Sequence, residues 1–536
     1  MPRSPFFLLS MVFREKFNRI GRRLINLGFF LMFFLGCTSP KIDDGVIIGN
    51  KSDEGIDNGP GFKNHISQDV NISWNEWNAN ILGKAVKQDK PLLLYFAVSG
   101  ADGIFSIENA SVRYLVENKF TSVRVNPFHR PDLARRYAPV GWPALSLLLN
   151  GGEHVALATD LPAHNARTWL MRMADHYDKR RHVLAERATS KKPLGSPIPL
   201  EVASVYKVVL AEADMIYGGF GRTEKFPELV VLHFLLQYNR IFQDKQALEM
   251  WKSAVDALLQ SPIWDAEIGG IHTFSYTADW TMPSGAKDAA DQAGILELLL
   301  MAHEIDTKRF APRLNKQLNY IKRHLFDSEQ NLFYGRQVLI SNHESGWWTD
   351  RTAYADRNAR LVVALLRAAE VLGQSQWAKM ALCVAETLSA EFIYSNGCVR
   401  HCLGEANSCT SGLLIDQLLV SRALWLMHEW SGDERFMEAS EKTLNWTERN
   451  LYDSHSGAFR DAMPIEEFAW PEHFPFRDNI HPAGNAVAIE LYLDRNRPKR
   501  VTQLATSIFT RGKVSRAHAG MAAALMRYQQ RVGSSL

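Results

Sequence analysis

Residues 453–459 read Asp-Ser-His-Ser-Gly-Ala-Phe, a short break between two long amphipathic stretches. Similar breaks, rich in Asp, Asn and Gly, recur upstream at intervals of roughly 60–65 residues. They are Trp264-Asp265…Gly269-Gly270-Ile271, Asp327…Asn331-Leu332-Phe333 and Ser395-Asn396-Gly397. This recurrence is too long for the helical-repeat arrays that have a period of about 34 residues.

Apolar residues with helical periodicity lie on both sides of these breaks and predict twelve helices. The predicted helices span 199–215, 227–241, 244–260, 288–305, 310–326, 355–372, 375–391, 412–430, 434–451, 484–495, 498–511 and 516–532. Long loops alternate with short ones, which favours six hairpins in a closed (α/α)6 toroid. An open α-solenoid is the alternative.

The preceding segment has a different pattern, in which short apolar runs alternate with helical stretches. The run Pro91–Val98 is typical of a buried strand. The predicted elements are helices at 73–90, 111–120 and 166–188, and strands at 91–98, 121–126, 144–149 and 154–159. Pro143, directly before a strand, suits the cis-proline turn of a thioredoxin-like domain. We therefore expect a multidomain chain: an α/β thioredoxin-like domain at 70–190, followed by an all-α (α/α)6 toroid at 199–535.

Several short motifs carry a resemblance to a known family. They are Arg130-Pro131-Asp132, Gly141-Trp142-Pro143, Gly218-Gly219-Phe220-Gly221 with Lys225-Phe226-Pro227, and Pro482-Ala483-Gly484-Asn485. Over about residues 70–535 the chain resembles the YyaL-like, or spermatogenesis-associated, proteins. That family joins a thioredoxin-like domain to a helical barrel related to N-acylglucosamine epimerases and six-hairpin glycosidases. The resemblance thus implies the same two domains.

The chain departs from this family at the redox motif. Family members carry two cysteines after the first strand, where this sequence has Ala101 and Ile104. Thiol–disulfide exchange needs a thiolate and a resolving thiol. No Cys lies between Cys37 and Cys383, so the predicted thioredoxin-like domain cannot perform dithiol chemistry.

Polar and aromatic residues gather in the long loops and at the helix starts that follow them. Sugar-binding sites combine aromatic platforms with carboxylates or histidines for proton transfer, and these loops supply both. The expected catalytic residues are His272, Asp291 and Asp416, and the expected substrate-binding residues are Trp280, Lys287, Trp347, Asn358, His473 and Asn485. Asp291, Asn358, Asp416 and Asn485 also match family motifs.

Each of these residues also has a structural interpretation. Asp288 and Asp356 fit helix caps or solvated positions. Asp291 could form an i,i+4 pair with Lys287. Asp416 falls in an apolar helix, so it either pairs with an Arg or faces the centre of the toroid. We favour the centre, because the family resemblance includes this residue.

The sequence does not name a reaction. Two carboxylates would suit a glycosidase, whereas two histidines from among His272, His401, His473 and His481 would resemble the epimerases. The family's His and Glu are replaced by Ser284 and Ala286, which weakens a catalytic interpretation. The leading hypothesis is a toroid that binds a carbohydrate or related polar metabolite and isomerises or hydrolyses it. The alternative is a non-catalytic binding or scaffold protein.

The N-terminus has the layout of a bacterial secretory signal. Basic residues precede an apolar run, Leu24–Leu35, that is too short for a membrane span of about 20 residues. Phe34-Leu35-Gly36-Cys37 resembles a lipobox, which implies a signal peptide at 1–36 and lipidation of Cys37. A signal anchor is the alternative. Residues 37–69 predict a flexible linker, and the expected location is the cell envelope, anchored to a membrane by lipid and facing the periplasm or exterior.

Net charge and cysteines exclude other partners and cofactors. The formal net charge is +3, and loss of residues 1–36, with six basic and one acidic side chain, would change it to −2. A chain of this charge is not expected to bind nucleic acid. Cys398, Cys402 and Cys409 flank His401 but match no strong zinc spacing, so a local disulfide or unpaired loop cysteines are favoured. We predict no metal and no cofactor.

Overall fold

A computed structural model describes residues 72–98, 110–139, 141–159, 163–189, 198–339, 346–404, 409–464, 472–479, 481–510 and 513–533. The predicted lipidation site Cys37, the linker and the substituted positions Ala101 and Ile104 lie outside these ranges. None of the helices within them is long and apolar enough to cross a membrane.

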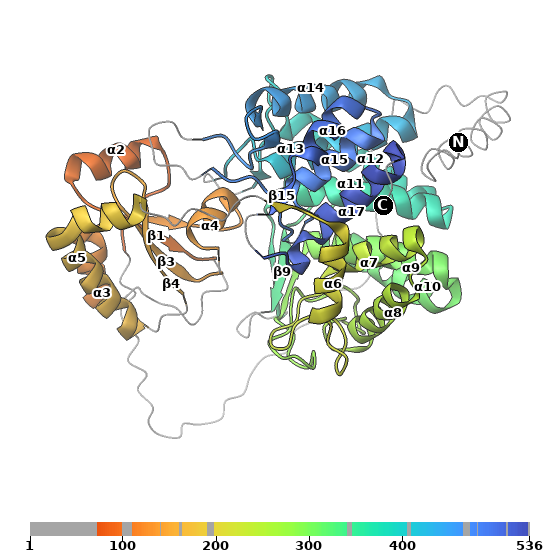
Figure 1. Cartoon of the computed structure of the whole chain (residues 1–536), viewed down its shortest axis with the longest axis horizontal. Helices are drawn as coiled ribbons and strands as arrows, with labels where there is room; N and C mark the ends of the chain where they lie inside the picture. The colour runs from red at the N-terminus through yellow and green to blue at the C-terminus, as the bar shows by residue number, and fades with distance from the viewer. Residues whose placement is uncertain are drawn as a thin grey trace, which may run out of the picture. The chain divides into compact units, whose positions relative to one another are not determined.

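The α/β part contains a four-stranded sheet with helices on both faces (Figure 1). Its elements are α2 (Ala79–Gln88), β1 (Leu92–Phe96), α3 (Ala110–Lys119), β2 (Thr121–Val125), α4 (Pro131–Tyr137), β3 (Ala144–Leu148), β4 (His154–Thr159) and α5 (Ala163–Thr189). The strand order is β2-β1-β3-β4, with β1 and β2 parallel and the other pairs antiparallel. The order of elements along the chain is as predicted, and the Trp142–Pro143 peptide is cis.

Strand β1 is buried on both faces, which explains its unbroken apolar sequence. Leu92, Leu94 and Phe96 pack with residues of α2 and α4 in one core cluster. Leu93 and Tyr95 belong to a second cluster with residues of α3 and α5. Because side chains alternate along a strand, this one segment supplies the centre of both cores.

Each of the twelve helices predicted downstream corresponds to a helix in the described ranges. They are α6 (Val202–Glu212), α7 (Leu229–Phe242), α8 (Lys245–Gln260), α9 (Ala289–Ile305), α10 (Thr307–Tyr320), α11 (Ala355–Leu372), α12 (Ser375–Thr387), α13 (Leu414–Ser431), α14 (Glu434–Asn450), α15 (Gly484–Asp494), α16 (Pro498–Thr506) and α17 (Ala519–Val532). Two boundaries differ clearly: α10 begins at Thr307 and ends at Tyr320 in a π-turn, and α16 ends at Thr506.

Six of these helices form a closed ring. Helices α7, α9, α11, α13, α15 and α17 contact one another in that order, and α17 contacts α7. Contacts that close on themselves exclude the open solenoid. The outer helices α8, α10, α12, α14 and α16 each pack on the inner helix before them, whereas α6 packs on α17. The first predicted helix therefore completes the hairpin of the last one.

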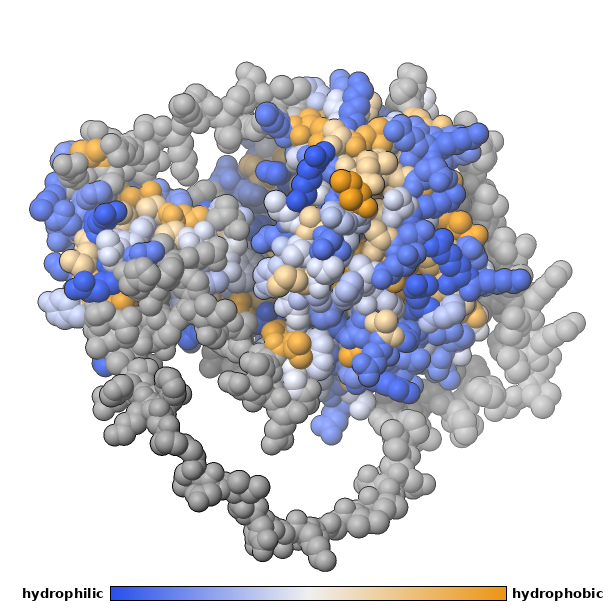
Figure 2. Space-filling view, turned by 90° about the horizontal axis from the view of Figure 1, so that it is seen from below, coloured by the Kyte–Doolittle hydropathy of each residue, from blue (hydrophilic) through white to orange (hydrophobic). Residues whose placement is uncertain are grey.

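Inner and outer helices differ in sequence as their positions require. Along α9 twelve residues are buried and no stripe of the helix is polar, whereas outer helix α8 buries only one face. The face seen in Figure 2 mixes hydrophilic residues with patches of hydrophobic ones. The breaks seen in the sequence lead from an outer helix into the next inner one, and residues at these junctions make up the candidate site.

Candidate functional site

Four amides at the starts of inner helices hold the preceding turns in place. The Asn358 amide accepts a hydrogen bond from the Phe333 backbone N–H at 2.7 Å and donates to the Phe333 carbonyl at 3.1 Å. Asn485 makes the same pair of bonds with Phe459, at 2.9 and 3.0 Å. Gln292 and Gln417 occupy equivalent positions in α9 and α13 and bond the backbones of Ile271 and Val399.

These bonds correct the interpretation of Asn358 and Asn485 as substrate-binding residues. Both side chains are buried, and Asn358 also donates to the Tyr354 carbonyl at 2.9 Å. Their hydrogen-bonding groups are committed to the backbone, where an unpaired buried polar group would be costly. The two residues belong to a set of side-chain amides that recurs around the ring and hydrogen-bonds each turn to the helix that follows it.

Lys287 is likewise structural. Its fully buried ammonium group donates to Asp265 Oδ2 at 2.7 Å and to the Gly269 carbonyl at 3.0 Å. It also lies 4.9 Å from the centre of the Trp347 ring. The i,i+4 pair with Asp291 is therefore wrong, because the partner of Lys287 lies 22 residues upstream.

The preceding turn repeats this arrangement. Lys225 donates to Asp214 Oδ2 and to the Gly218 carbonyl, both at 2.6 Å. The buried Trp280 ring lies 5.5 Å from this ammonium group, and its indole N–H donates to the Tyr217 carbonyl at 3.0 Å. Trp280 and Trp347 therefore each cover a buried lysine, and Trp280 does not stand as an open sugar platform.

The two histidines predicted for the site lie in different surroundings. His272 packs beside Trp347, with ring centres 6.0 Å apart. Burial, followed by the nearby charge of Lys287, lowers the pKa of His272 to about 4, so this imidazole is neutral near pH 7. His473 lies 3.5 Å from Asp461 and is partly exposed. The structure shows no contact of either residue with Asp291 or Asp416.

A network of buried charges occupies the starts of α9 and α11. The Arg357 guanidinium donates to both carboxylate oxygens of Asp288, at 3.0 to 3.3 Å, and to Asp356 at 3.1 Å. Asp356 also accepts a hydrogen bond from His481 Nε2 at 2.9 Å. Asp288 still caps α9 by accepting from the Ala290 N–H, so its predicted role as a cap is confirmed. The expectation that Asp356 is a cap or solvated is wrong, since it is buried in this network.

The network leaves Asp291 without a cationic partner. Its carboxylate is buried, and Oδ2 has no hydrogen-bond partner. Burial, and then the neighbouring charge of Asp288, raises the pKa of Asp291 to about 7. Arg360 donates to Glu297 at 2.9 Å and is neutralised there. Asp291 is thus a carboxyl group that exists in both protonation states near neutral pH, which suits general acid–base chemistry.

Asp416 pairs with a histidine instead of the arginine considered from the sequence. His401 Nδ1 lies 2.8 Å from Asp416 Oδ2, and His401 Nε2 lies 2.8 Å from the carbonyl oxygen of Phe128. A carbonyl can only accept, so Nε2 carries a proton and Nδ1 faces the carboxylate. Burial lowers the pKa of His401, but the Asp416 carboxylate opposes this and raises it overall.

Phe128 brings the α/β domain to this site. Its ring covers the guanidinium of Arg336, 4.4 Å from the ring centre, and that of Arg357 at 5.6 Å. Nearby, Arg136 of α4 binds both oxygens of Asp461, at 2.6 and 2.9 Å, and both side chains are 2% exposed. These contacts fix a segment of the α/β domain against the titratable groups of the ring.

Of the nine predicted site residues, Asp291 and Asp416 belong to the charged network at the starts of the inner helices. The network also contains Arg357 and Arg360, which the sequence prediction missed, and His401 and His481, which it named only as available. A detectable signal existed: Asp356, Arg357 and Arg360 are charged residues at the start of a helix that is buried on most faces. Among the described residues, Asp356, His401 and Asp416 lie close enough together to hold a metal ion.

Comparisons with known proteins bear on the relatives of the chain and on the fold of its helical part. No family model matches the sequence. Spermatogenesis-associated protein 20 of Rattus norvegicus is 26% identical over 313 residues, which are 51% of this chain and 40% of the rat protein. The chain is homologous to spermatogenesis-associated protein 20. The Homo sapiens protein of that name is 26% identical over 321 residues, and the chain spans about two fifths of the length of these curated relatives.

A solved structure identifies the fold of the ring. A D-mannose isomerase superposes with a TM-score of 0.50 at 11% sequence identity, covering 62% of this chain and 96% of the isomerase. This similarity and the closed contacts of the inner helices show that the ring is an (α/α)6 toroid.

Proposed function

We propose that the toroid binds a carbohydrate or a related polyhydroxylated metabolite at the network around Asp288, Asp291 and Arg357, and isomerises or hydrolyses it. The observation that carries the proposal is Asp291, whose buried Oδ2 has no partner. A buried, unsatisfied carboxylate costs free energy, and such costs are typical of residues kept for function. The isomerase with the same fold supports a sugar ligand by analogy.

Asp291 would transfer the proton in this reaction. With a pKa of about 7, it can donate a proton to a sugar oxygen in one step and accept one in another. The Oδ2 atom is buried without a partner, so a ligand hydroxyl reaches it when the surrounding side chains move. Arg357 and Arg360 hold the neighbouring carboxylates of Asp288 and Glu297 in fixed positions.

The test is the substitution Asp291→Asn. With D-mannose, D-glucose and cellobiose as probes, we expect the wild type to show a ligand-dependent rise in melting temperature. The variant is expected to bind about 10-fold more weakly, because it loses a charged hydrogen bond. Any turnover should fall at least about 10²-fold. Asp478→Asn is the matched control, since Asp478 is partly buried and its two oxygens accept bonds from the Gly520 and Ala483 N–H groups.

The stability of the Asp291→Asn variant gives a second readout. Because the folded-state pKa is raised, the contribution of Asp291 to stability is full below its ordinary pKa of 3.8 and is lost as pH rises through about 7. At pH 8 the neutral amide should therefore make the variant more stable than wild type by about 1 kcal/mol or more. Equal sugar binding by both proteins, or a variant that is less stable at pH 8, would contradict the proposed role.

A non-catalytic binding protein is the second candidate. The replacement of the family's His and Glu by Ser284 and Ala286 favours it. Sugar binding without turnover in the same experiment would select this candidate.

We also propose that the α/β part is a thioredoxin-like domain with a structural task. Its strand order and its cis Pro143 support the assignment, and homology to spermatogenesis-associated protein 20 is consistent with it. Without the two cysteines, its contribution is the Phe128 carbonyl, which fixes the tautomer of His401.

The N-terminal sequence supports a third proposal, that the chain is a cell-envelope lipoprotein anchored at Cys37. The basic stretch, the short apolar run and the lipobox-like Phe34–Cys37 carry it. In a bacterial host fed a tagged fatty acid, wild type should be labelled and recovered with membranes, whereas Cys37→Ala should lose the label. Unlabelled wild-type protein would contradict the proposal.

A further inference from the structure

Three potential metal ligands converge from separate elements. Asp356 begins helix α11, His401 precedes the short strand β12 (Cys402–Leu403), and Asp416 lies in the first turn of α13. One ligand atom from each lies within 4.8 Å of the others, and all three residues are buried. Zinc–ligand bonds measure about 2.0–2.2 Å, so an ion would fit after small movements of the three side chains, with His401 Nδ1 and Asp416 Oδ2 moving apart from their present 2.8 Å.

Two of these side chains already have an atom placed to bind a metal ion. Asp416 is fully buried, and its Oδ1 has no hydrogen-bond partner. His401 donates its Nε2 proton to the Phe128 carbonyl at 2.8 Å, which leaves Nδ1 to face the two carboxylates. Metal-binding histidines typically donate their second N–H to a carbonyl or carboxylate in this way, because that bond fixes the ring and its tautomer.

The carboxylates of the network also outnumber the cations that contact them. Asp288, Asp356 and Asp416 supply three negative charges, and Arg357 is the guanidinium that contacts this set. Arg360 is paired with Glu297. His481 accepts from the Arg360 guanidinium at Nδ1 and donates to Asp356 at Nε2, so it is neutral. When His401 is neutral, as metal binding requires, these groups carry an excess of two negative charges in a buried site, which a bound ion would balance.

We propose that Asp356, His401 and Asp416 bind one divalent transition-metal ion, Zn²⁺ or Mn²⁺. One imidazole and two carboxylates suit these ions better than Mg²⁺ or Ca²⁺, which prefer oxygen ligands alone. Arg357 remains on the two oxygens of Asp288 and orients Asp356 from the side. The proposal goes beyond the sugar site and does not depend on it. It also replaces the prediction of no metal, which only considered ligands close together in sequence.

The experiment uses the full chain, stripped with a chelator and then titrated with Zn²⁺, Mn²⁺ or Mg²⁺. We expect one equivalent of Zn²⁺ or Mn²⁺ by elemental analysis and a melting temperature raised by about 2–4 °C, with little effect of Mg²⁺. Asp416→Asn and His401→Gln should each weaken binding at least 10-fold. Asp478→Asn, which changes a partly buried carboxylate elsewhere, should bind like wild type.

Two further readouts keep the outcome clear. If either ligand variant fails to fold, the visible spectrum of Co²⁺ bound to the wild type decides: nitrogen and oxygen ligands support the site, and thiolate ligands overturn it. No bound metal, or binding unchanged in both ligand variants, also overturns the proposal. Asp291→Asn should retain the metal, so failure of the sugar site and failure of the metal site give different results.

Discussion

Replacing Arg357 by Met is expected to lower the free energy of unfolding by about 3–5 kcal/mol, the usual cost of removing one partner of a buried ion pair. The Arg357 side chain is 4% exposed and holds Asp288 and Asp356 apart. Although burial opposes ionisation, Arg357 and then His481 keep the pKa of Asp356 well below its usual value. Without the guanidinium, two buried carboxylates would face each other uncompensated.

Chemical denaturation at several pH values measures this effect. Because the pKa of Asp356 is depressed, its stabilising contribution exists above its unfolded pKa and is lost as pH falls through the folded value. The difference between wild type and Arg357→Met should therefore shrink in acid. Arg435→Met is the control, since this side chain is 76% exposed in its pair with Asp433 and should change stability by less than about 1 kcal/mol. An equal effect of both substitutions would contradict the role of Arg357.

Arg136→Met is the second substitution with a large expected effect, of about 3–5 kcal/mol. Arg136 binds both oxygens of Asp461, and neither side chain is accessible to solvent. Burial would raise the pKa of Asp461, but His473, Arg135 and Arg136 hold it far below its usual value. The ion pair joins α4 to the toroid, so its loss should also loosen Phe128 from His401.

A double-mutant cycle of Arg136→Met with Asp461→Asn isolates this contact. We expect a coupling energy of about 2–3 kcal/mol between the two sites. The exposed helical pair Arg113 and Glu117 is the comparison, where a coupling of about 0.3–0.5 kcal/mol is typical. A coupling between Arg136 and Asp461 no larger than that would show that the α/β domain does not bind the toroid through this pair.

Helix positions could be predicted from the sequence because they depend on local periodicity. The apolar pattern of α9 and the Asp-, Asn- and Gly-rich breaks were enough to place inner and outer helices in alternation. The pairing of α6 with α17 could not be predicted in this way, because it joins segments about 300 residues apart. Nothing local distinguishes a first helix that pairs with its neighbour from one that closes a ring.

The candidate site was predictable only in part, for a similar reason. Asp416 was identified because a carboxylate in an apolar helix needs an explanation, and Asp291 because it lies at a helix start after a polar loop and matches a family motif. Asn358, Asn485 and Lys287 have partners in the backbone or in turns 18 to 26 residues away, so their structural roles were invisible in the sequence. The contribution of Phe128 depends on a carbonyl oxygen, which no side-chain pattern reveals.

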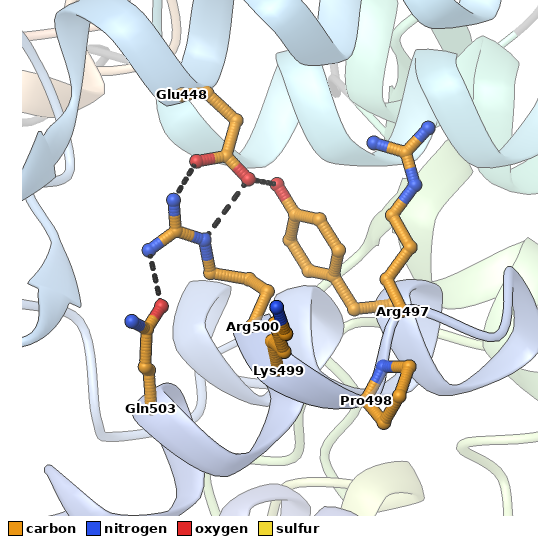
Figure 3. A pocket seen from close by; sticks show the side chains of 7 residues that line it. Glu448, Arg497, Pro498, Lys499, Arg500 and Gln503 are labelled. Atoms are coloured by element: carbon orange, nitrogen blue, oxygen red, sulfur yellow. Dashed lines mark hydrogen bonds and ion pairs between the residues drawn. The ribbon is translucent and has the colours of Figure 1, made fainter.

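The outer surface offers a contrasting location for a ligand. A depression of about 550 Å³ lies between α14, α15 and α16, and Figure 3 shows Arg500 bound to Glu448 and Gln503 within it. Two of its cations, Arg497 and Arg500, are already paired with carboxylates, as in the bond from Arg497 to Glu441 at 2.6 Å. No member of the central network lines it.

The central claim is that the network around Asp291 is the ligand site of the toroid. The most direct measurement is a crystal structure of the full chain with the sugar that most raises its melting temperature. We predict density for the sugar within hydrogen-bonding distance of Asp291 Oδ2, between the starts of α9 and α11. Density in the outer depression beside Arg500, or anywhere remote from Asp291, would contradict the account.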